Sequence, residues 1–154
     1  MKTALINGRI FDGNELHDGL AVVLDGDRIV SLLPQQDIHG AFDTTWDLDG
    51  HILAPGLIDI QVNGGGGVMF NNAPTVETIR SMGLVHRRFG TTGFLPTLIS
   101  CDFDTMSQAI EAVRQAISAG VPGVLGIHLE GPCLNADNRG IHNADRFCHL
   151  DEAA

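Results

Sequence analysis

One carboxylate, Glu130, lies at a position where an α/β protein would place a catalytic or ligand-binding side chain. It follows the mostly apolar run at residues 124–129 and precedes Gly131-Pro132, and proline cannot continue a strand ladder. Active sites of parallel α/β proteins are built at the carboxyl ends of strands. A glutamate after a strand is also often a solvated loop residue, and the residues alone weigh these two interpretations about evenly.

Three polar side chains accompany Glu130 in this pattern. Because side chains alternate along a strand, His128 shares a face with Glu130, although a histidine in an apolar strand is more often a hydrogen-bonded core residue than a ligand. Gln61 and Asn63 alternate likewise at the end of an earlier strand. Zinc prefers imidazole, thiolate or carboxylate, so these amides would instead hydrogen-bond a metal-bound water or a substrate. The simpler interpretation is a pair of turn-forming amides.

The four glycines Gly64 to Gly67 do not form a nucleotide-binding motif. The chain has neither G-x-G-x-x-G nor G-x-x-x-x-G-K-[ST] here, and no lysine follows. A flexible turn that lets the backbone approach a ligand closely is the more economical interpretation.

The remaining histidines differ in their surroundings. His142 lies in a polar loop shortly after Glu130, which makes it a candidate substrate contact. His86 and His149 have no such neighbours, and we assign them no role. The chain contains no Gly-x-Ser-x-Gly elbow and no cysteine with an evident histidine partner, so covalent catalysis is not supported.

Composition excludes several classes of function. The 154 residues carry a formal net charge of −10, which disfavours nucleic acid and anionic membrane surfaces as partners. Hydrophobic residues make up 44%, enough for a core, and no apolar run approaches the ~20 residues of a membrane span. Three cysteines without a C-x-x-C pair argue against a disulfide framework or zinc ribbon and indicate a reducing compartment. We therefore expect a cytoplasmic protein.

The first 53 residues predict short strands separated by turns. Asn7-Gly8, Asp25-Gly26 and Asp49-Gly50 are hairpin-type dipeptides between β-branched runs. The expected strands lie at residues 4–6, 9–11, 21–24, 28–33, 45–48 and 51–53. We expect a small antiparallel β unit without a helix.

After Pro55 the pattern changes to alternating strands and helices. Strands are expected at residues 57–62, 94–99 and 124–129. Thr75 is expected to cap a helix that ends near Gly90. Asp102 or Asp104 caps a second helix, which ends at Gly120 and has one apolar face made by Met106, Ile110, Val113 and Ile117. This order predicts an α/β parallel sheet with right-handed crossovers, which is too short to close a barrel of about 250 residues.

Several stretches resemble one family. LAPGLID at residues 53–59 resembles the first barrel strand of the amidohydrolase superfamily. IQVNGGGGV at 60–68, GTTGFLPT at 90–97, HLEGP at 128–132 and GIHN at 140–143 resemble the N-acetylglucosamine-6-phosphate deacetylase family. The resemblance implies a (β/α)₈ TIM barrel beside a small β-sandwich. Residues 1–53 would be the N-terminal part of the sandwich domain, and residues 54–154 the first strands and helices of a truncated barrel.

The resemblance also implies an activity and site residues. The family hydrolyses N-acetylglucosamine 6-phosphate to glucosamine 6-phosphate and acetate, so the implied partner is a small amino-sugar phosphate. Glu130 matches the metal-ligating glutamate, and Ile141 and His142 match the substrate-contacting pair. Gln61-x-Asn63 replaces the usual His-x-His, which resembles the subgroup with one divalent metal ion per site, zinc or iron.

The same resemblance implies that the chain is catalytically incomplete. Two further metal-binding histidines and the general-base aspartate would lie beyond Ala154, so we expect an inactive N-terminal fragment of an enzyme that is homo-oligomeric when complete. One alternative is another amidohydrolase, either a cyclic-amide hydrolase or a deaminase. A second alternative is a non-catalytic partner domain that pairs with a separately encoded half.

Overall fold

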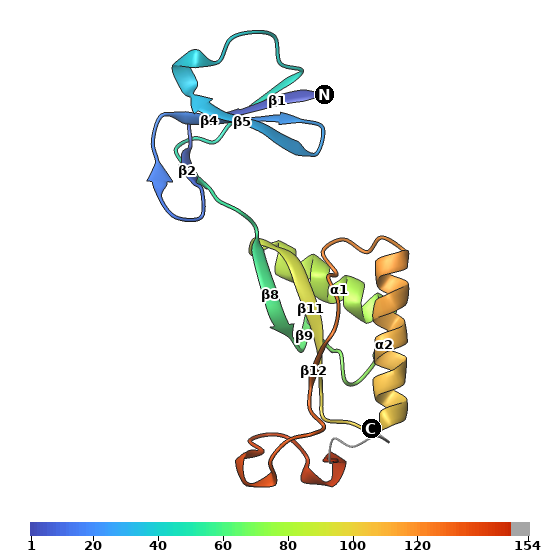
Figure 1. Ribbon diagram of the computed structural model, residues 1–154. Coiled ribbons are helices and arrows are strands. Elements are labelled where there is room, and N and C mark those ends of the chain that lie inside the picture. Colours follow the sequence, from blue (N-terminus) through green and yellow to red (C-terminus); the bar gives the residue numbers. More distant parts are fainter. Residues whose placement is uncertain (149–154) are drawn as a thin grey trace. The chain divides into compact units, whose positions relative to one another are not determined.

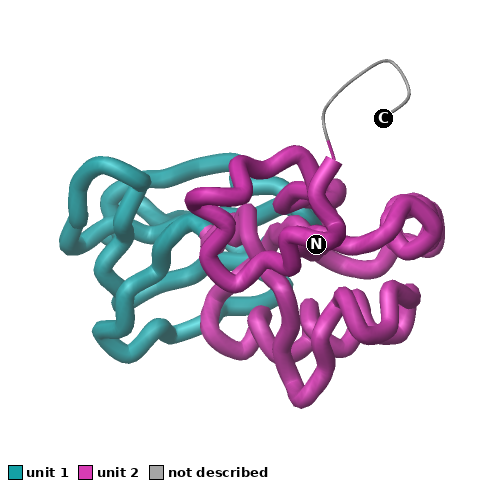
Figure 2. Tube along the Cα trace, turned by 90° about the horizontal axis from the view of Figure 1, so that it is seen from below, with its two compact units in different colours: residues 1–55 teal, residues 56–154 magenta. Residues whose placement is uncertain are grey.

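The computed structural model describes residues 1–148 and divides the chain into two compact units. The first is Met1–Pro55 and the second is Gly56–Ala154 (Figures 1 and 2). Of the second unit, residues 56–148 are described, so His149 lies outside the described residues.

The first unit contains two sheets. One has the order β5-β4-β1-β6, and the other has the order β3-β2-β7. The strands are β1 (Lys2–Ile6), β2 (Arg9–Phe11), β3 (Leu16–His17), β4 (Leu20–Asp25), β5 (Arg28–Pro34), β6 (Thr44–Asp47) and β7 (Ile52–Leu53). A short 3₁₀ helix, Gln35–Asp37, follows β5. Buried side chains of Ala4, Ile10 and Val22 contribute to the core of this unit.

The expectation that this unit is antiparallel throughout is wrong. The β1–β6 and β2–β7 pairs are parallel. Of the three predicted hairpin dipeptides, Asp25-Gly26 alone joins two neighbouring antiparallel strands, β4 and β5. Asn7-Gly8 and Asp49-Gly50 instead carry the chain from one sheet to the other. These two crossings are hydrogen-bonded to each other, since the amide of Gly50 donates to the oxygen of Asn7 at 2.7 Å. Asn7 and Asp49 have φ values of 57° and 48°, so a left-handed turn residue here serves a crossing rather than a hairpin.

The second unit is a mixed α/β structure, as the sequence predicts. Its parallel sheet has the order β12-β11-β8 and is formed by β8 (Leu57–Val62), β11 (Thr91–Ile99) and β12 (His128–Glu130). The helices are α1 (Val76–Arg87) and α2 (Phe103–Ser118), which lie side by side against one face of this sheet (Figure 1). The minor elements are the hairpin strands β9 (Gly64–Gly65) and β10 (Val68–Met69) and the 3₁₀ helices Ala136–Asn138 and Ala144–Arg146.

The predicted third strand is shorter than expected. Residues 128–130 pair regularly with β11, whereas Val124 forms only an isolated bridge with Phe94. From Phe94 to Thr97 the chain of β11 advances three residues, while the facing segment advances four, from Val124 to His128. The extra residue bulges and interrupts the ladder. The regular part of the strand is therefore the part that ends in Glu130.

Both helices begin at the predicted caps. The side chain of Thr75 accepts the amide of Thr78 at 3.2 Å, and that of Asp102 accepts the amide of Thr105 at 2.8 Å. Of the two aspartates considered for α2, Asp102 is the cap.

The buried face of α2 differs from the predicted one. Val113 is buried, but Ile110 and Ile117 are 44% and 48% exposed. The other buried residues of α2 are Ala109, Ala112 and Ala116. These small side chains let α2 approach α1 and β11 closely. Among residues 1–148, neither helix combines the length and apolar character needed to cross a bilayer.

We predict that the cap of α2 makes stability depend on pH. The Thr105 amide lowers the pKa of Asp102, so its stabilising contribution is present above the unfolded-state pKa and is lost as pH falls through the lower folded-state pKa. Asp102→Ala should lower the melting temperature at pH 7, while Asp102→Asn keeps an acceptor and should lower it less. Circular dichroism from pH 7 to pH 2 would measure both, and an Ala deficit that does not shrink in acid would contradict the assignment.

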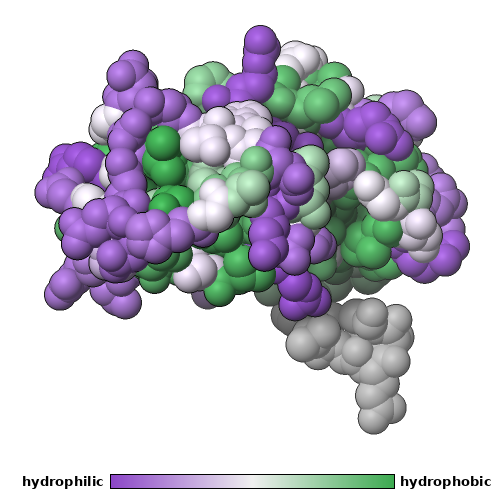
Figure 3. All heavy atoms as spheres, turned by 90° about the horizontal axis from the view of Figure 1, so that it is seen from above, coloured by the Kyte–Doolittle hydropathy of each residue, from purple (hydrophilic) through white to green (hydrophobic). Residues whose placement is uncertain are grey.

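Exposed apolar side chains on β8 generate a second prediction. Ile58 and Ile60 are 63% and 68% exposed on an edge strand, and hydrophobic surface is visible among hydrophilic side chains on the face drawn in Figure 3. Exposed apolar edge strands promote association. Removing one buried isoleucine from an interface costs about 1.5–3 kcal/mol, so Ile60→Lys should weaken self-association of the chain about 10- to 150-fold.

Sedimentation velocity over a concentration series measures this effect. Ile110→Lys, on the exposed side of α2, is the matched control and should change self-association less. A wild-type chain that stays monomeric at every concentration would contradict the prediction.

Candidate functional site

The carboxyl ends of the three parallel strands gather a group of polar side chains. Gln61 comes from the end of β8 and Glu130 from the end of β12, on either side of β11. The amide Nε2 of Gln61 donates to Oε2 of Glu130 at 3.0 Å. A single side-chain hydrogen bond therefore links the two strands that flank the central one.

His142 returns to this group from the loop after β12. Its Nε2 lies 3.4 Å from Oε1 of Glu130, and its Nδ1 lies 2.9 Å from Oγ of Ser100, the residue after β11. The residue is only 9% exposed, so the loop buries the imidazole against the strand ends. The ring also lies 6.4 Å from that of Phe147, centroid to centroid.

The proton positions follow from these contacts. An ionised carboxylate only accepts hydrogen bonds, so Nε2 of His142 must carry the proton that faces Glu130. With a neutral imidazole, Nδ1 is then an acceptor, and Ser100 must donate its hydroxyl proton to it. Glu130 thus selects the tautomer of His142, and the hydroxyl of Ser100, which can donate or accept, adapts to it by donating. With His142 in this neutral form, both oxygens of Glu130 are contacted by neutral donors, and neither contact compensates its negative charge.

The turn after Glu130 depends on glycine. Gly131 has φ of 95°, a left-handed conformation, and a Cβ there would collide with Oγ of Ser100. Gly131 therefore permits the approach of Ser100 that positions His142. The following peptide, Gly131–Pro132, is cis.

His128 has the hydrogen-bonded core role that the residues alone favoured. Its Nδ1 lies 3.3 Å from Oγ1 of Thr97, which is fully buried on β11. Thr97 donates its own proton to the oxygen of Leu95, so the histidine is the donor to Thr97. This contact fixes the orientation of the His128 ring, two residues before Glu130 in β12.

The four glycines form a tight hairpin. Gly66 and Gly67 have φ of 65° and 84° between β9 and β10, as a two-residue hairpin turn requires. A Cβ on Gly65 would lie 2.8 Å from Nε2 of His86 on α1, and that nitrogen contacts the oxygen of Gly64 at 3.0 Å. His86 therefore anchors the hairpin to α1, a structural role away from Glu130.

Two sequence candidates are placed differently. Asn63 follows β8 at the same sheet end as Glu130, and its backbone oxygen accepts the amide of Phe70. Ile141 is 89% exposed, so its side chain does not join the buried group around His142. A substrate role for each of these residues stays a prediction.

Sequence reasoning missed two residues of this region. Ser100 directly follows β11, which is the positional signal that identified Asn63 and Glu130 on the other strands. Asn71 hydrogen-bonds the backbone N–H and C=O of Ile99, both at 3.0 Å, and so closes the end of β11. The sequence around Asn71 gives no signal of this pairing.

The described residues supply part of a metal site. Within residues 1–148, no three His, Cys, Asp or Glu side chains converge as ligands for a metal ion. Glu130 fits as one oxygen ligand because its charge is uncompensated. The nitrogens of His142 are engaged by Ser100 and Glu130, so this tautomer offers no free lone pair to a metal.

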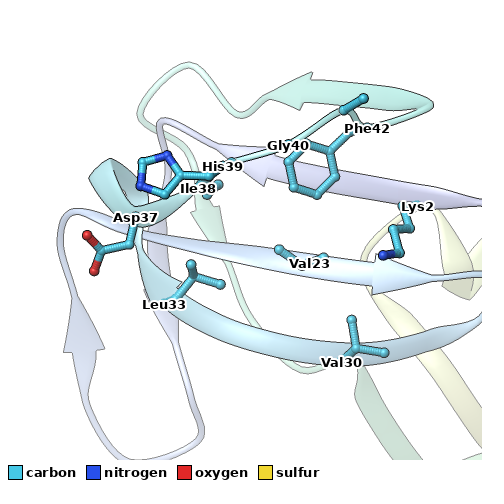
Figure 4. Close-up of a pocket in the computed structure, with 10 residues that line it drawn as sticks. Lys2, Val23, Val30, Leu33, Asp37, Ile38, His39, Gly40 and Phe42 are labelled. Carbon is cyan, nitrogen blue, oxygen red and sulfur yellow. The ribbon is translucent and has the colours of Figure 1, made fainter.

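A cavity in the first unit is a weaker candidate. It has a volume of about 360 Å³ and is lined by Lys2, Asp37, His39 and apolar side chains. Figure 4 shows Lys2 and Asp37 at opposite sides of the cavity, with Phe42 and Val23 between them. Its charged groups therefore do not converge as the polar groups around Glu130 do.

Comparison with known proteins gives a consistent relationship. Residues 3–53 match the family model of the NagA composite domain. An N-acetylglucosamine-6-phosphate deacetylase of Haemophilus influenzae is 36% identical over 145 residues, covering 94% of this chain and 38% of that protein. An N-acetylgalactosamine-6-phosphate deacetylase of Shewanella sp. (strain ANA-3) is 56% identical over 90 residues, covering 58% of this chain and 23% of that protein.

A solved structure agrees with these relatives. The N-acetylglucosamine-6-phosphate deacetylase of Pasteurella multocida superposes with a TM-score of 0.93 at 33% identity, over 99% of this chain and 40% of that one. The chain thus spans about two fifths of the length of these two deacetylases. The family resemblance inferred from the sequence motifs is confirmed.

We predict that Glu130 controls the tautomer of His142. Glu130→Ala removes the acceptor of Nε2–H, so the ring should populate both neutral tautomers, because the Ser100 hydroxyl can donate to Nδ1 or accept from it. Ser100→Ala leaves the carboxylate in place and should keep the wild-type tautomer. The ¹⁵N chemical shifts of the two ring nitrogens, measured above pH 8, report this directly. Identical shifts in wild type and Glu130→Ala would contradict the assignment.

Proposed function

Since the chain is related along nearly its whole length to N-acetylglucosamine-6-phosphate deacetylases, we propose that it forms the N-terminal part of such an enzyme. The proposed reaction is hydrolysis of the acetamide of an N-acetylated amino sugar 6-phosphate, with release of acetate and the free amine. The observation that carries the proposal is the 36% identity over 145 residues. The cluster around Glu130 supports it, because a charged, partly buried carboxylate lies where an α/β enzyme builds its site.

The proposal assigns a place in a larger fold to each unit. Residues 54–154 would begin a (β/α)₈ barrel, and residues 1–53 would contribute one part of a β-sandwich. The arrangement of α1 and α2 on one face of the sheet supports the barrel, since a doubly wound sheet carries helices on both faces (Figure 1). Exposed Leu57, Ile58 and Ile60 on β8 are apolar side chains that further barrel elements would cover.

Glu130 is the proposed ligand of one divalent metal ion, zinc or iron. Zinc catalysis takes about three protein ligands, so further ligands and the general-base aspartate would come from outside the described residues. A divalent ion bound there would supply Lewis acidity to the acetamide carbonyl. Gln61 holds the second carboxylate oxygen and so fixes the direction from which Glu130 reaches a cation.

The other residues of the site would act on substrate. His142 is held by Ser100 with its Nε2–H facing Glu130, which places a hydrogen-bond donor at the edge of the proposed metal position. Asn63, at the same strand end, would orient water or substrate, and the backbone at Ile141 would contact the sugar phosphate. His128 would act only indirectly, through its hydrogen bond to Thr97. The complete enzyme would be a cytoplasmic homo-oligomer.

A second substrate is a specific alternative. The Shewanella relative, 56% identical over 90 residues, is named for N-acetylgalactosamine 6-phosphate, which differs from the glucosamine substrate in the configuration at C4. A chimera that joins residues 1–154 to the remaining part of the Pasteurella multocida enzyme can be assayed with both sugar phosphates. Turnover of either one supports the deacetylase proposal. Absence of turnover with both, in a folded chimera, would contradict it, and the 154-residue chain alone is expected to be inactive.

We predict that two substitutions in this chimera differ in their effect on metal content. Glu130→Gln keeps the shape but removes a negative charge from the metal position, so bound metal and turnover should both fall. Loss of a residue that only orients a metal ligand already lowers metal affinity or activity ~10–100-fold, so loss of the ligand itself should lower them at least as much. Asn63→Ala should lower turnover while metal content stays near that of the unsubstituted chimera.

Metal content by mass spectrometry and initial rates would be measured on the same preparations. Full metal content together with full activity in Glu130→Gln would show that Glu130 is not a ligand. Glu130→Asp is the matched comparison, because it keeps the carboxylate and should retain more metal than Glu130→Gln.

A further inference from the structure

Two cysteines meet across the loop that carries His142. Sγ of Cys133 and Sγ of Cys148 lie 3.2 Å apart, although 15 positions separate the residues in sequence. The backbone brings the two ends together independently, since the amide of Cys148 donates to the oxygen of Pro132 at 3.3 Å. The two sulfurs thus close the loop at its base.

Further contacts hold this loop in the same arrangement. Arg146 pairs with Asp102 at the start of α2, with 3.6 Å between Nη1 and Oδ2. His142 contacts Ser100 and Glu130 from the middle of the loop. The two cysteines therefore lie at the base of a loop that several contacts hold against the strand ends.

We propose that Cys133 and Cys148 are a modification site, at which an intramolecular disulfide forms reversibly and locks the loop carrying Ile141 and His142. The sulfurs are not bonded at 3.2 Å, and a bond of about 2.05 Å needs a relative movement of about 1 Å, within reach of side-chain rotation.

The oxidant is a peroxide. One thiolate attacks hydrogen peroxide, the O–O bond breaks, and a sulfenic acid and water form. The second thiolate then attacks the sulfenic sulfur and releases a second water. The balance is two thiols and one H₂O₂ giving one disulfide and two H₂O. A dithiol reductant reverses the bond by thiol–disulfide exchange, so in a reducing compartment the thiol form is restored.

The third cysteine is the internal comparison. Cys101, at the end of β11, is partly buried, and burial together with the neighbouring Asp102 raises the pKa of its thiol. Cys133 is exposed. Because the thiolate is the reactive form, Cys101 is the poorer partner. The proposed bond is a property of this chain and does not require the deacetylase function, although its effect on substrate binding would.

The arginines of the chain make the pairing easy to map. Trypsin separates the three cysteines into the peptides 89–114, 115–139 and 147–154, which contain Cys101, Cys133 and Cys148 respectively. The 154-residue chain would be treated with hydrogen peroxide at low concentration, alkylated, digested without reductant and analysed by mass spectrometry.

The expected product is peptide 115–139 linked to peptide 147–154, in a monomeric chain that has lost two hydrogens, and dithiothreitol should release both peptides. Cys101→Ser should give the same product. Cys133→Ser should give no linked peptide. Trypsin should also cleave after Arg139 more slowly in the folded, oxidised wild-type chain than in Cys133→Ser. A link that involves peptide 89–114, a link only between two chains, or three separately alkylated peptides would overturn the proposal, whichever way the variants fold.

Discussion

The hydrogen bond between Gln61 and Glu130 is the interaction on which the site depends. It joins two strands that do not pair with each other, since β11 lies between β8 and β12. Its formation requires all three strands to run parallel and to end at the same edge of the sheet. The crossovers through α1 and α2 provide this order. Buried Ile79 and Met82 of α1, and the buried alanines and Val113 of α2, pack in the core beside β11. The second carboxylate oxygen then receives His142 from the following loop.

The charge of Glu130 explains why this cluster suits catalysis. Gln61, and His142 in its neutral form, are donors that leave the carboxylate's charge in place. A partly buried anion is costly unless a cation pairs with it, and the proposed divalent metal would be that cation. Ser100 and Gly131 contribute indirectly, because they position the imidazole of His142, which borders the same carboxylate. Strand order, loop conformation and electrostatics therefore converge on one side chain.

Local signals in the sequence predicted the elements that depend on local interactions. Thr75 and Asp102 were identifiable as caps because a cap requires only a side-chain acceptor at the start of a helix. Glu130 was identifiable because strand alternation and the following Gly131-Pro132 are both visible in consecutive residues of the sequence. The parallel pairing of β1 with β6 was not predictable from Asn7-Gly8, because the same dipeptide serves a hairpin or a crossing and only the distant partner Gly50 decides. Ser100 was missed for the same reason, since its partner lies 42 positions away.

The most direct test of the central claim is anomalous diffraction from crystals of the chimera described above, grown with zinc. The account predicts one anomalous peak with a carboxylate oxygen of Glu130 about 2.0–2.2 Å from the metal and the amide of Gln61 hydrogen-bonded to the other oxygen. A peak coordinated by other residues, with Glu130 turned away from it, would contradict the assignment of Glu130 as the metal ligand around which this part of the fold is organised.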